Sequence, residues 1–314
     1  MFQFTMKITK REESLLLRSK LALLVDLDQT LIDSLKVEPD DGIQGEGMEQ
    51  LIVQKKDGGI KHKHMFLRPG TREFLESISH NYDLYVCTKS KQGHAQAVTR
   101  FIDPHGKYFA ERIYTRRYCT GETKLSVLER LFQSNENPLV VIIDDNAEKW
   151  PGVKQLIHVP RYQCFDFLKP EKNRNTDSSE PMINPDLPKP IIVSRMEDNY
   201  LYFLANKLNT IHENFYQAYN KTRRPLSSMK MNEVQPAPTT VLKKSSDVNS
   251  VMVTHRRPIP NLADLIHSSP IQPLPPTSAD CLHVESTTKC ERKTRSGRTI
   301  KLPARFHPYD LSTH

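Results

Sequence analysis

The sequence of 314 residues lacks any apolar run that approaches the roughly 20 residues needed to cross a membrane. Residues 1–20 also lack the apolar centre of a signal peptide, so we expect a soluble protein made in the cytosol. The five cysteines form no CxxC pair and have no spacing typical of a zinc site. This pattern predicts reduced thiols in an intracellular protein.

Composition changes along the chain and predicts one folded unit followed by a poorly ordered tail. Hydrophobic residues make up 37% of the chain, and most strong apolar runs lie before Pro170. Prolines and Ser, Thr, Lys and Arg residues crowd the stretch after Arg223. The sequence therefore predicts an N-terminal extension, a central domain, a helical extension that packs on it and a disordered basic tail. These parts span residues 1–20, 21–170, 171–223 and 224–314.

The chain is basic, with a formal net charge of +8 and a pI near 9.1. Excess positive potential concentrates anions near a protein surface, which fits an acidic or phosphorylated partner. An ordinary basic nuclear protein has the same balance, so charge leaves both interpretations open. A cluster near the C-terminal end fits a nuclear-import or nucleic-acid patch as well as a solvated tail. Its members are Arg292, Lys293, Arg295, Arg298, Lys301 and Arg305.

Short apolar runs alternate with helical patterns in the central domain. The runs Leu21–Val25, Asp83–Cys87 and Val140–Ile143 have the length and lack of polar alternation typical of strands buried on both faces. Apolar residues at helical spacing predict helices that carry Phe74–Ile78, Ala95–Ile102 and Leu125–Leu131. The alternation favours a Rossmann-like parallel sheet flanked by helices, whose ligands bind at the carboxyl ends of the strands.

Two further elements are expected around and after this sheet. Asp57-Gly58-Gly59 separates two partly apolar stretches within residues 50–67, which predicts a β-hairpin inserted after the first strand. Thr71 is in position to cap the helix that follows. Residues 200–219 carry apolar side chains at helical spacing, so we expect a helix that packs against the sheet domain.

Two pairs of aspartates follow predicted strands. Asp26 and Asp28 come directly after the run LALLV, and Asp144 and Asp145 follow the run LVVII. Carboxylates two residues apart at a strand end can point into one small space. Mg²⁺ compensates such clustered charges because it prefers oxygen ligands. An isolated DxD is as often a loop of turn-forming or capping aspartates, but two acidic pairs that each end an apolar strand favour a metal site.

The stretch LLVDLDQTLI resembles the DxDxT signature of the haloacid dehalogenase superfamily. The longer match is to RNA polymerase II C-terminal-domain phosphatases of the Fcp type, and it covers most of residues 20–220. The supporting stretches are LRPGTREFLESIS, YDLYVCT, FIDPHGKYFAERIYTRRYC, TKLSVLERLF, VVIIDD followed by Trp150, and YLYFLANKLNTIHENFY. The resemblance implies a haloacid-dehalogenase-like α/β fold, with residues 21–170 as the catalytic phosphatase domain.

The resemblance also implies catalytic roles for four residues. Asp26 matches the nucleophile, which attacks phosphorus and forms a transient aspartyl-phosphate. Asp28 matches the general acid that protonates the departing seryl oxygen and then activates water. Thr88 matches a hydroxyl that holds a phosphoryl oxygen, and Lys124 matches a lysine that offsets phosphoryl charge. The plainer alternatives are a strand-end hydroxyl bonded to backbone for Thr88 and a solvated lysine at a helix start for Lys124.

Metal and supporting roles follow from the same resemblance. The Mg²⁺ ligands that it implies are Asp26, Asp145 and the backbone carbonyl of Asp28. Asp144 would orient Lys124. The remaining supporting residues, which lie in motifs that the family uses at or beside the site, are Thr30, Arg68 and Asp103.

Two features depart from the family pattern. After Thr88 the chain reads KSKQGHAQ, in which His94 replaces a tyrosine that the family commonly has and Lys89 and Lys91 add positive charge. This departure bears on substrate preference, because the carboxylates and the hydroxyl are intact. The larger members carry a phosphopeptide-binding BRCT module, and the stretch after Arg223 is too short and too poor in apolar runs to build one. We expect targeting by that module to be absent or replaced by the tail.

Two classes of function remain open. The first is a nuclear, Mg²⁺-dependent protein serine/threonine phosphatase that acts on the phosphorylated C-terminal repeat of RNA polymerase II. General transcription factors, and nucleic acid at the basic tail, are further partners that the sequence leaves open. The second is a catalytically inactive phosphoprotein-binding module with the same fold. Intact Asp26, Asp28, Lys124 and Asp145 favour the enzyme, since a cluster of like charges is costly to keep. Within the enzyme class, the long insert before Arg68 favours the larger polymerase phosphatases over the small C-terminal-domain phosphatases and a related mitochondrial translocase component.

Overall fold

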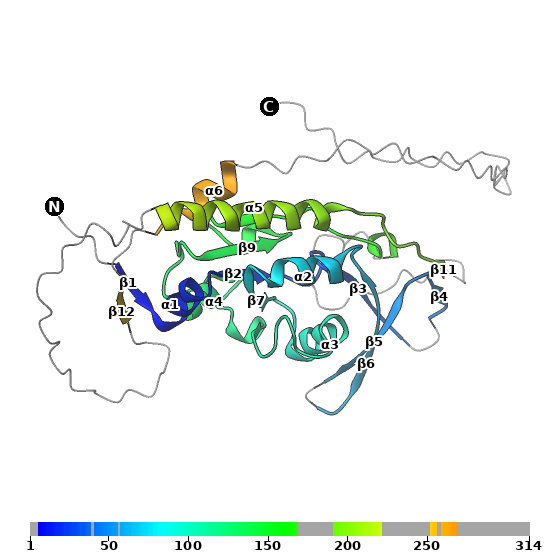
Figure 1. The fold of residues 1–314 in the computed structure, drawn as a ribbon. Coiled ribbons are helices and arrows are strands. Elements are labelled where there is room, and N and C mark those ends of the chain that lie inside the picture. Colours follow the sequence, from blue (N-terminus) through cyan, green and yellow to red (C-terminus); the bar gives the residue numbers. More distant parts are fainter. Residues whose placement is uncertain are drawn as a thin grey trace, which may run out of the picture. The chain divides into compact units, whose positions relative to one another are not determined.

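The computed structural model describes residues 6–38, 41–55, 57–168, 191–221, 252–255 and 259–268. Within these ranges the chain builds a five-stranded sheet in the order β10-β9-β2-β7-β8 (Figure 1). Its strands are β2 (Leu21–Val25), β7 (Tyr82–Cys87), β8 (Ile113–Tyr114), β9 (Val140–Asp144) and β10 (Leu156–His158). Every neighbouring pair is parallel, which confirms the predicted α/β class.

Three amphipathic helices link these strands. They are α2 (Thr71–Ser79), α3 (Gln92–Ile102) and α4 (Leu125–Phe132), and each buries the apolar stripe that its sequence predicted, except that Leu125 is only partly buried. The predicted cap of α2 is wrong, because Gly70 precedes the helix with a φ of 75° and Thr71 is the first helical residue. Only glycine adopts that backbone conformation readily. The Thr71 hydroxyl instead donates back to the carbonyl of Arg68 at 2.8 Å.

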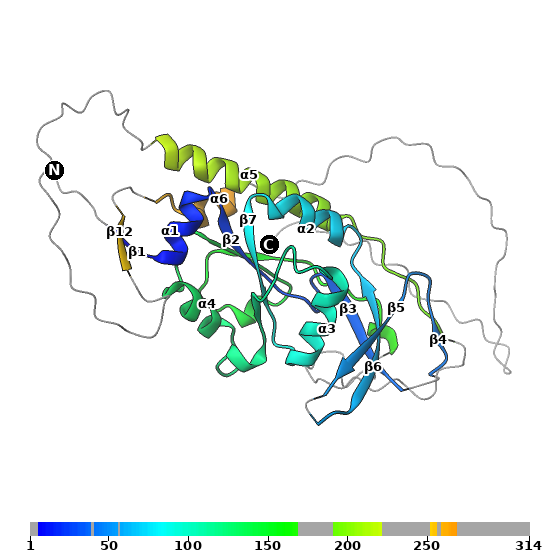
Figure 2. The same ribbon diagram turned by 60° about the horizontal axis from the view of Figure 1, so that its bottom comes forward.

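A three-stranded antiparallel sheet is inserted after β2, in the order β3-β6-β5 (Figure 2). Its strands are β3 (Ile32–Val37), β5 (Glu49–Gln54) and β6 (Ile60–Leu67). The predicted hairpin is confirmed as β5 and β6, and β3 adds a third strand on the other side of β6. Gly93 allows the insert to approach α3 closely, since a Cβ there would collide with the carbonyl oxygen of Gln54. The insert therefore lies next to the segment that follows β7.

The insert has an apolar core that is shared with the chain after β10. Phe66 of β6 stacks on Phe165 with ring centroids 5.2 Å apart. β4 (Ile43–Gln44) pairs in parallel with β11 (Ile191–Ile192), which the sequence did not predict. The buried members of this core are Leu35, Val37, Ile43, Phe66, Tyr162, Cys164, Phe165, Leu168, Ile191 and Val193.

The long helix α5 (Tyr200–Lys221) confirms the predicted C-terminal helix and packs along α2 (Figure 1). Its apolar stripe is buried, with Leu208, Ile211 and Phe215 fully covered. The Tyr82 hydroxyl at the start of β7 donates to the carbonyl of Leu208 at 2.6 Å. This helix is therefore part of the same folded body as the sheet.

The remaining elements come from the two ends of the described chain. β1 (Met6–Thr9) pairs antiparallel with β12 (Met252–His255), and α1 (Lys10–Leu17) starts with a capping box made by Thr9 and Glu12. Helix α6 (Leu262–Ser268) packs on α5 and buries Leu262 and Ile266. The predicted disorder after residue 223 is thus wrong for β12 and α6, because elements this short show no sustained period in sequence. The rest of that tail lies outside the described residues.

All described residues lie in one compact unit, residues 1–273, and the second unit, residues 274–314, lies outside the described residues. The domain boundaries expected at residues 20, 170 and 223 stay predictions. In the described part of the chain, no helix combines the length and the apolar character needed to span a bilayer. Cys87, Cys119 and Cys164 are free thiols, and Cys281 and Cys290 fall outside the described residues.

Candidate active site

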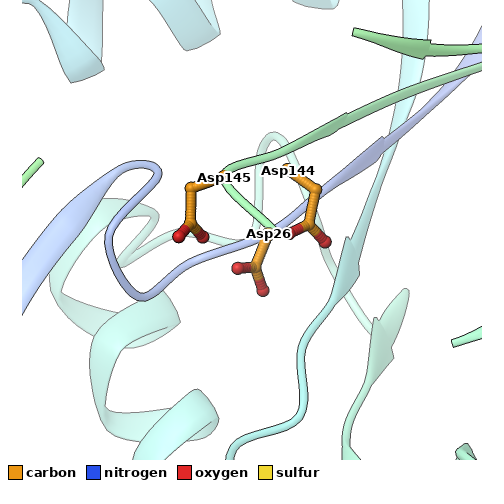
Figure 3. Close-up of side chains that lie close together, drawn as sticks. All are labelled: Asp26, Asp144 and Asp145. Carbon is orange, nitrogen blue, oxygen red and sulfur yellow. The ribbon is translucent and has the colours of Figure 1, made fainter. Parts of the chain in front are cut away.

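The carboxylates of Asp26, Asp144 and Asp145 converge where β2 and β9 end (Figure 3). These strands are parallel neighbours with Val25 opposite Ile143, so the residues that follow them meet at one edge of the sheet. One oxygen from each carboxylate lies within 4.8 Å of the others, and all three residues are buried. The two acidic pairs, far apart in sequence, therefore contribute to one cluster.

Lys124 is the cation inside this cluster. It directly precedes α4 and is only 2% exposed. Its Nζ lies 2.6 Å from Oδ2 of Asp144 and 2.8 Å from Oδ1 of Asp26. Burial by itself lowers the pKa of Lys124, but the two carboxylates outweigh it and raise the pKa well above its ordinary value. The solvated-lysine alternative is wrong, and Lys124 is a buried ammonium.

Donors from the protein satisfy both oxygens of Asp144. Its Oδ2 accepts hydrogen bonds from Lys124 Nζ and from Trp150 Nε1 at 2.7 Å. Its Oδ1 accepts the backbone N–H of Asn146 at 2.9 Å. Asp144 therefore has the contacts expected of a residue that orients Lys124.

Asp26 and Asp145, unlike Asp144, have carboxylate oxygens that can still bind a ligand. Oδ1 of Asp26 contacts Lys124, and Oδ2 of Asp145 contacts Arg161 at 3.0 Å. Neither carboxylate accepts a hydrogen bond from a further described residue, so each has a second oxygen that can bind a ligand. Because the two oxygens come from neighbouring strand ends, they can face one shared ligand.

The cluster fits a divalent cation. Burial and the neighbouring carboxylates raise the pKa of Asp26 well above its ordinary value, although the ammonium of Lys124 opposes them. Burial and Asp144 likewise raise the pKa of Asp145 to about 6. A cation between the carboxylates would reverse both shifts, since it favours their ionised forms. Carboxylate oxygens are also the ligands that Mg²⁺ prefers.

Asp28 follows Asp26 by two residues, and its carboxylate is held by hydrogen bonds. Its Oδ1 is 2.8 Å from Nε2 of His94 and accepts the Ser34 hydroxyl at 3.4 Å, and its Oδ2 accepts the Ser90 hydroxyl at 2.5 Å. Burial raises the pKa of Asp28, but His94, Lys63 and Ser90 outweigh it and hold the pKa well below its usual range. The side chain is 32% exposed, so the protein covers it only in part. The metal contact expected of its backbone carbonyl stays a prediction.

Thr88 follows directly after β7 and is 2% exposed. Its backbone N–H donates to the carbonyl of Tyr114 at 2.9 Å, and its Oγ1 accepts the backbone N–H of Ser90 at 3.1 Å. The plainer alternative, a hydroxyl bonded to backbone, thus describes one of its contacts. The hydroxyl hydrogen has no acceptor among the described residues, so Thr88 can still donate to a ligand.

Thr30 and Arg68 fix the loop that follows β2. The Thr30 hydroxyl accepts the backbone N–H of Asp145 at 3.1 Å, and the Thr30 carbonyl accepts from Arg68 Nη1 at 3.0 Å. Arg68 is 1% exposed and also donates to the carbonyl of Pro160 at 3.0 Å. Its Nε and Nη2 reach Oδ2 of Asp198 at 3.0 and 2.7 Å. Arg68 therefore supports the loop and makes no described contact with the carboxylate cluster.

We expect Arg68→Ala to destabilise the fold by about 3–5 kcal/mol, because it removes a fully buried guanidinium and leaves the largely covered carboxylate of Asp198 without that partner. Urea denaturation of the variant and the wild type measures the difference. Arg72→Ala is the matched control nearby in α2, and its exposed side chain predicts a loss under about 1 kcal/mol. Equal losses for the two variants would contradict the supporting role of Arg68.

Asp103 anchors a loop rather than the cluster. Its Oδ1 accepts the backbone N–H of Lys107 at 2.7 Å, and its Oδ2 accepts those of Tyr108 and Phe109 at 2.9 and 2.8 Å. It follows α3 nine residues after His94, which at about 1.5 Å per residue is roughly 13 Å along the helix. None of its described contacts reaches the three carboxylates.

Several residues that touch the site were not predicted from the sequence, among them His94, Ser90 and Arg161. His94 was noted only as a departure from the family pattern, and Ser90 and Arg161 were not noted at all. The signal for His94 was its replacement of a family tyrosine. Nothing in the sequence pairs Arg161 with Asp145 or Ser90 with Asp28, since these contacts exist only after the strand ends are brought together.

A parallel sheet with acidic residues at adjacent strand ends defines a haloacid-dehalogenase-like α/β protein. Residues 21–178, half of the chain, match the family described as NLI interacting factor-like phosphatase. The chain therefore belongs to this phosphatase family.

Curated relatives point in the same direction. An RNA polymerase II C-terminal domain phosphatase of Caenorhabditis elegans is 30% identical over 210 residues, which are 67% of this chain and 30% of that protein. The Homo sapiens protein of the same name is 35% identical over 156 residues, which are 46% of this chain and 15% of that protein. The chain thus spans less than a third of the length of these two relatives.

Solved structures confirm the fold. Fission yeast RNA polymerase II CTD phosphatase Fcp1, a variant bound to beryllium fluoride, aligns with a TM-score of 0.51 and 25% identity over 68% of each chain. A further structure of Fcp1, described as an essential RNA polymerase II CTD phosphatase, aligns with a TM-score of 0.52 and 23% identity over 68% of each chain. The second likeness concerns the fold alone.

Proposed function

We propose that this protein is a Mg²⁺-dependent protein serine/threonine phosphatase that works through an aspartyl-phosphate. The observation that carries the proposal is the carboxylate of Asp26, which is buried at a strand end between Lys124 and Asp145. Its Oδ1 lies 2.8 Å from the ammonium of Lys124, and the carboxylate accepts no hydrogen bond from a further described residue. A carboxylate placed in this way can attack a phosphoryl group.

The reaction divides between Asp26 and Asp28. In the free protein the neighbours of Asp28 hold its pKa low, so Asp28 takes up the proton it needs only when the negative charge of the bound phosphoryl group raises that pKa. Asp26 attacks phosphorus, and the bond from phosphorus to the seryl or threonyl oxygen breaks while Asp28 gives that oxygen this proton. Asp28, now ionised, takes a proton from water, and the resulting nucleophile releases phosphate from Asp26. Its side chain is partly exposed and follows Asp26 by two residues, so we place it within reach of both the leaving oxygen and the water.

Charge compensation comes from three sources. Asp26, Asp145 and the Asp28 carbonyl would hold Mg²⁺, which stabilises negative charge on the phosphoryl oxygens when it is bound. The buried ammonium of Lys124 supplies a fixed positive charge at the same place. The Thr88 hydroxyl donates to a phosphoryl oxygen. Groups fixed in these positions need no reorganisation as charge develops in the transition state.

The substrate that we propose is the phosphorylated C-terminal repeat of RNA polymerase II, carried by its largest polypeptide. The names of the C. elegans and human relatives support this, as does the net charge of +8, which favours an acidic partner. Action on this substrate places the protein in the nucleus and in transcription. Contacts of the basic tail with nucleic acid and contacts with general transcription factors stay predictions.

Hydrolysis of polymerase tail-repeat peptides, each phosphorylated at a different serine, tests the proposal. We expect phosphate release that depends on Mg²⁺ and favours one phosphoserine, and no release by Asp26→Asn. The competing function is a catalytically inactive phosphoprotein-binding module. Binding of the same peptides without phosphate release by the wild type would establish that module in place of the enzyme.

A further inference from the structure

The carboxylate of Asp28 is held by side chains from three separate parts of the chain. Ser90 follows β7 and donates to Oδ2 at 2.5 Å, and His94 of α3 contacts Oδ1 at 2.8 Å. Ser34 of the inserted sheet is more distant, at 3.4 Å from Oδ1. The two short contacts bind different oxygens, so together they fix the rotation of the carboxylate about its side-chain bonds. Neither residue is assigned a role by the family resemblance or by the relatives.

His94 has no other described polar contact. Its side chain is 6% exposed, and its Nδ1 is buried without a hydrogen-bond partner among the described residues. Burying an unpaired polar nitrogen costs free energy, so packing alone does not explain an imidazole at this position. A phenylalanine or leucine would fill the same space without that cost. The contact with Asp28 is therefore the feature that only a polar side chain supplies.

We propose that His94 and Ser90 are positioning residues that aim the Asp28 carboxyl at the leaving oxygen of the substrate. This inference rests on the proposed function, because it assigns Asp28 the proton transfer. Both partners keep their contact when Asp28 carries the proton and when it does not. The Ser90 hydroxyl and the imidazole Nε2 each donate to a carboxylate or accept from a carboxyl O–H. A group that must act first as acid and then as base needs partners of this kind, because misplacement by about 1 Å can cost on the order of 10²-fold in rate.

The leaving group of the substrate provides the test. A seryl oxygen leaves slowly unless it receives a proton, whereas a nitrophenolate leaves without one. We expect His94→Phe to lower kcat/KM for a phosphoserine peptide by about 30-fold or more, and for p-nitrophenyl phosphate by less than about threefold. Ser90→Ala should show the same split with a smaller loss. kcat/KM is the parameter to compare, because it reports formation of the aspartyl-phosphate and not its later hydrolysis.

Three further variants separate positioning from a structural role. His94→Gln keeps a side-chain amide that can donate to or accept from Asp28, so it should restore most of the phosphoserine activity. In an Asp28→Asn background, His94→Phe should have no further effect on either substrate, because its partner is already disabled. His80→Phe makes the same replacement on the exposed surface and should leave both activities unchanged. A loss that is equal for the two substrates, or undiminished in the Asp28→Asn background, would overturn the proposal.

The test distinguishes this inference from the proposed function. If Asp26→Asn retains turnover of both substrates, the nucleophile assignment fails and the function falls with it. If Asp26→Asn is inactive and His94→Phe lowers both activities equally, only the positioning role fails. Circular dichroism and thermal unfolding of His94→Phe identify a variant that does not fold. In that case Ser90→Ala tests the positioning role with the same two substrates, since it removes only one hydroxyl from a partly exposed side chain.

Discussion

Asp26→Asn is expected to lower phosphatase activity by on the order of 10⁴-fold or more, because a neutral amide cannot form the aspartyl-phosphate. Hydrolysis of a phosphoserine peptide in the presence of Mg²⁺ measures the loss. The amide has nearly the shape of the carboxylate and removes one like charge from a buried cluster. We therefore expect the free energy of unfolding to stay within about 1 kcal/mol of the wild type.

The matched control for this variant is Asp57→Asn at the tip of the hairpin. Asp57 is exposed and accepts the backbone N–H of Gly59 at 3.0 Å, a bond that asparagine can also accept. Its activity should equal that of the wild type. Turnover by Asp26→Asn above a tenth of the wild-type rate would refute the nucleophile assignment. Binding of the phosphopeptide by the inactive variant should persist, since Lys124 and Thr88 are unchanged.

Removal of the divalent cation should also lower turnover strongly. The two carboxylates with oxygens left open, Asp26 and Asp145, have raised pKa values caused by burial and neighbouring charge. Lewis-acid stabilisation of several kcal/mol corresponds to at least about a 100-fold fall in turnover on chelation. Adding Mg²⁺ after the chelator should restore the rate. Activity that survives excess chelator would reject the metal site.

A binding measurement checks the same site without turnover. Mg²⁺ that binds only the folded protein stabilises it by RT ln(1 + [L]/Kd), so Tm of the wild type should rise with Mg²⁺ concentration. Asp145→Asn removes one proposed ligand and should flatten that rise. Asp166→Asn, in the short helix Asp166–Leu168, is the control and should respond to Mg²⁺ as the wild type does. A rise that is the same in Asp145→Asn would contradict the ligand role of Asp145.

Local sequence pattern was sufficient for the main features of the sheet and for part of the site. The runs LALLV, DLYVC and LVVII became adjacent parallel strands because strands buried on both faces carry continuous apolar residues. The acidic residues that follow two of these runs necessarily end at the same edge of such a sheet. For this reason the sequence pattern alone could place Asp26, Asp144 and Asp145 together.

The sequence pattern was not sufficient where a residue's contacts depend on a distant part of the chain, or where a helix or strand is short. Asp103 was grouped with the site as a supporting residue because it lies in a family motif, and that role stays a prediction, since its carboxylate binds the backbone of the loop at residues 107–109. Thr71 was expected to cap α2, but the left-handed conformation of Gly70 moves the start of the helix. Helix α6 and strand β12 are too short for their periods to stand out.

The sequence by itself determined the α/β class, the insert after β2 and the meeting of two acidic pairs, because each follows from local periodicity and from the geometry of parallel strands. Only the tertiary structure decided how the site is held. Arg68 pairs with Asp198, and His94 and Ser90 bind Asp28, across 130, 66 and 62 positions of the chain. Hydrogen bonds of this kind cannot be predicted from the periodicity of the sequence, because they join side chains that are far apart along the chain and that meet only when the protein is packed.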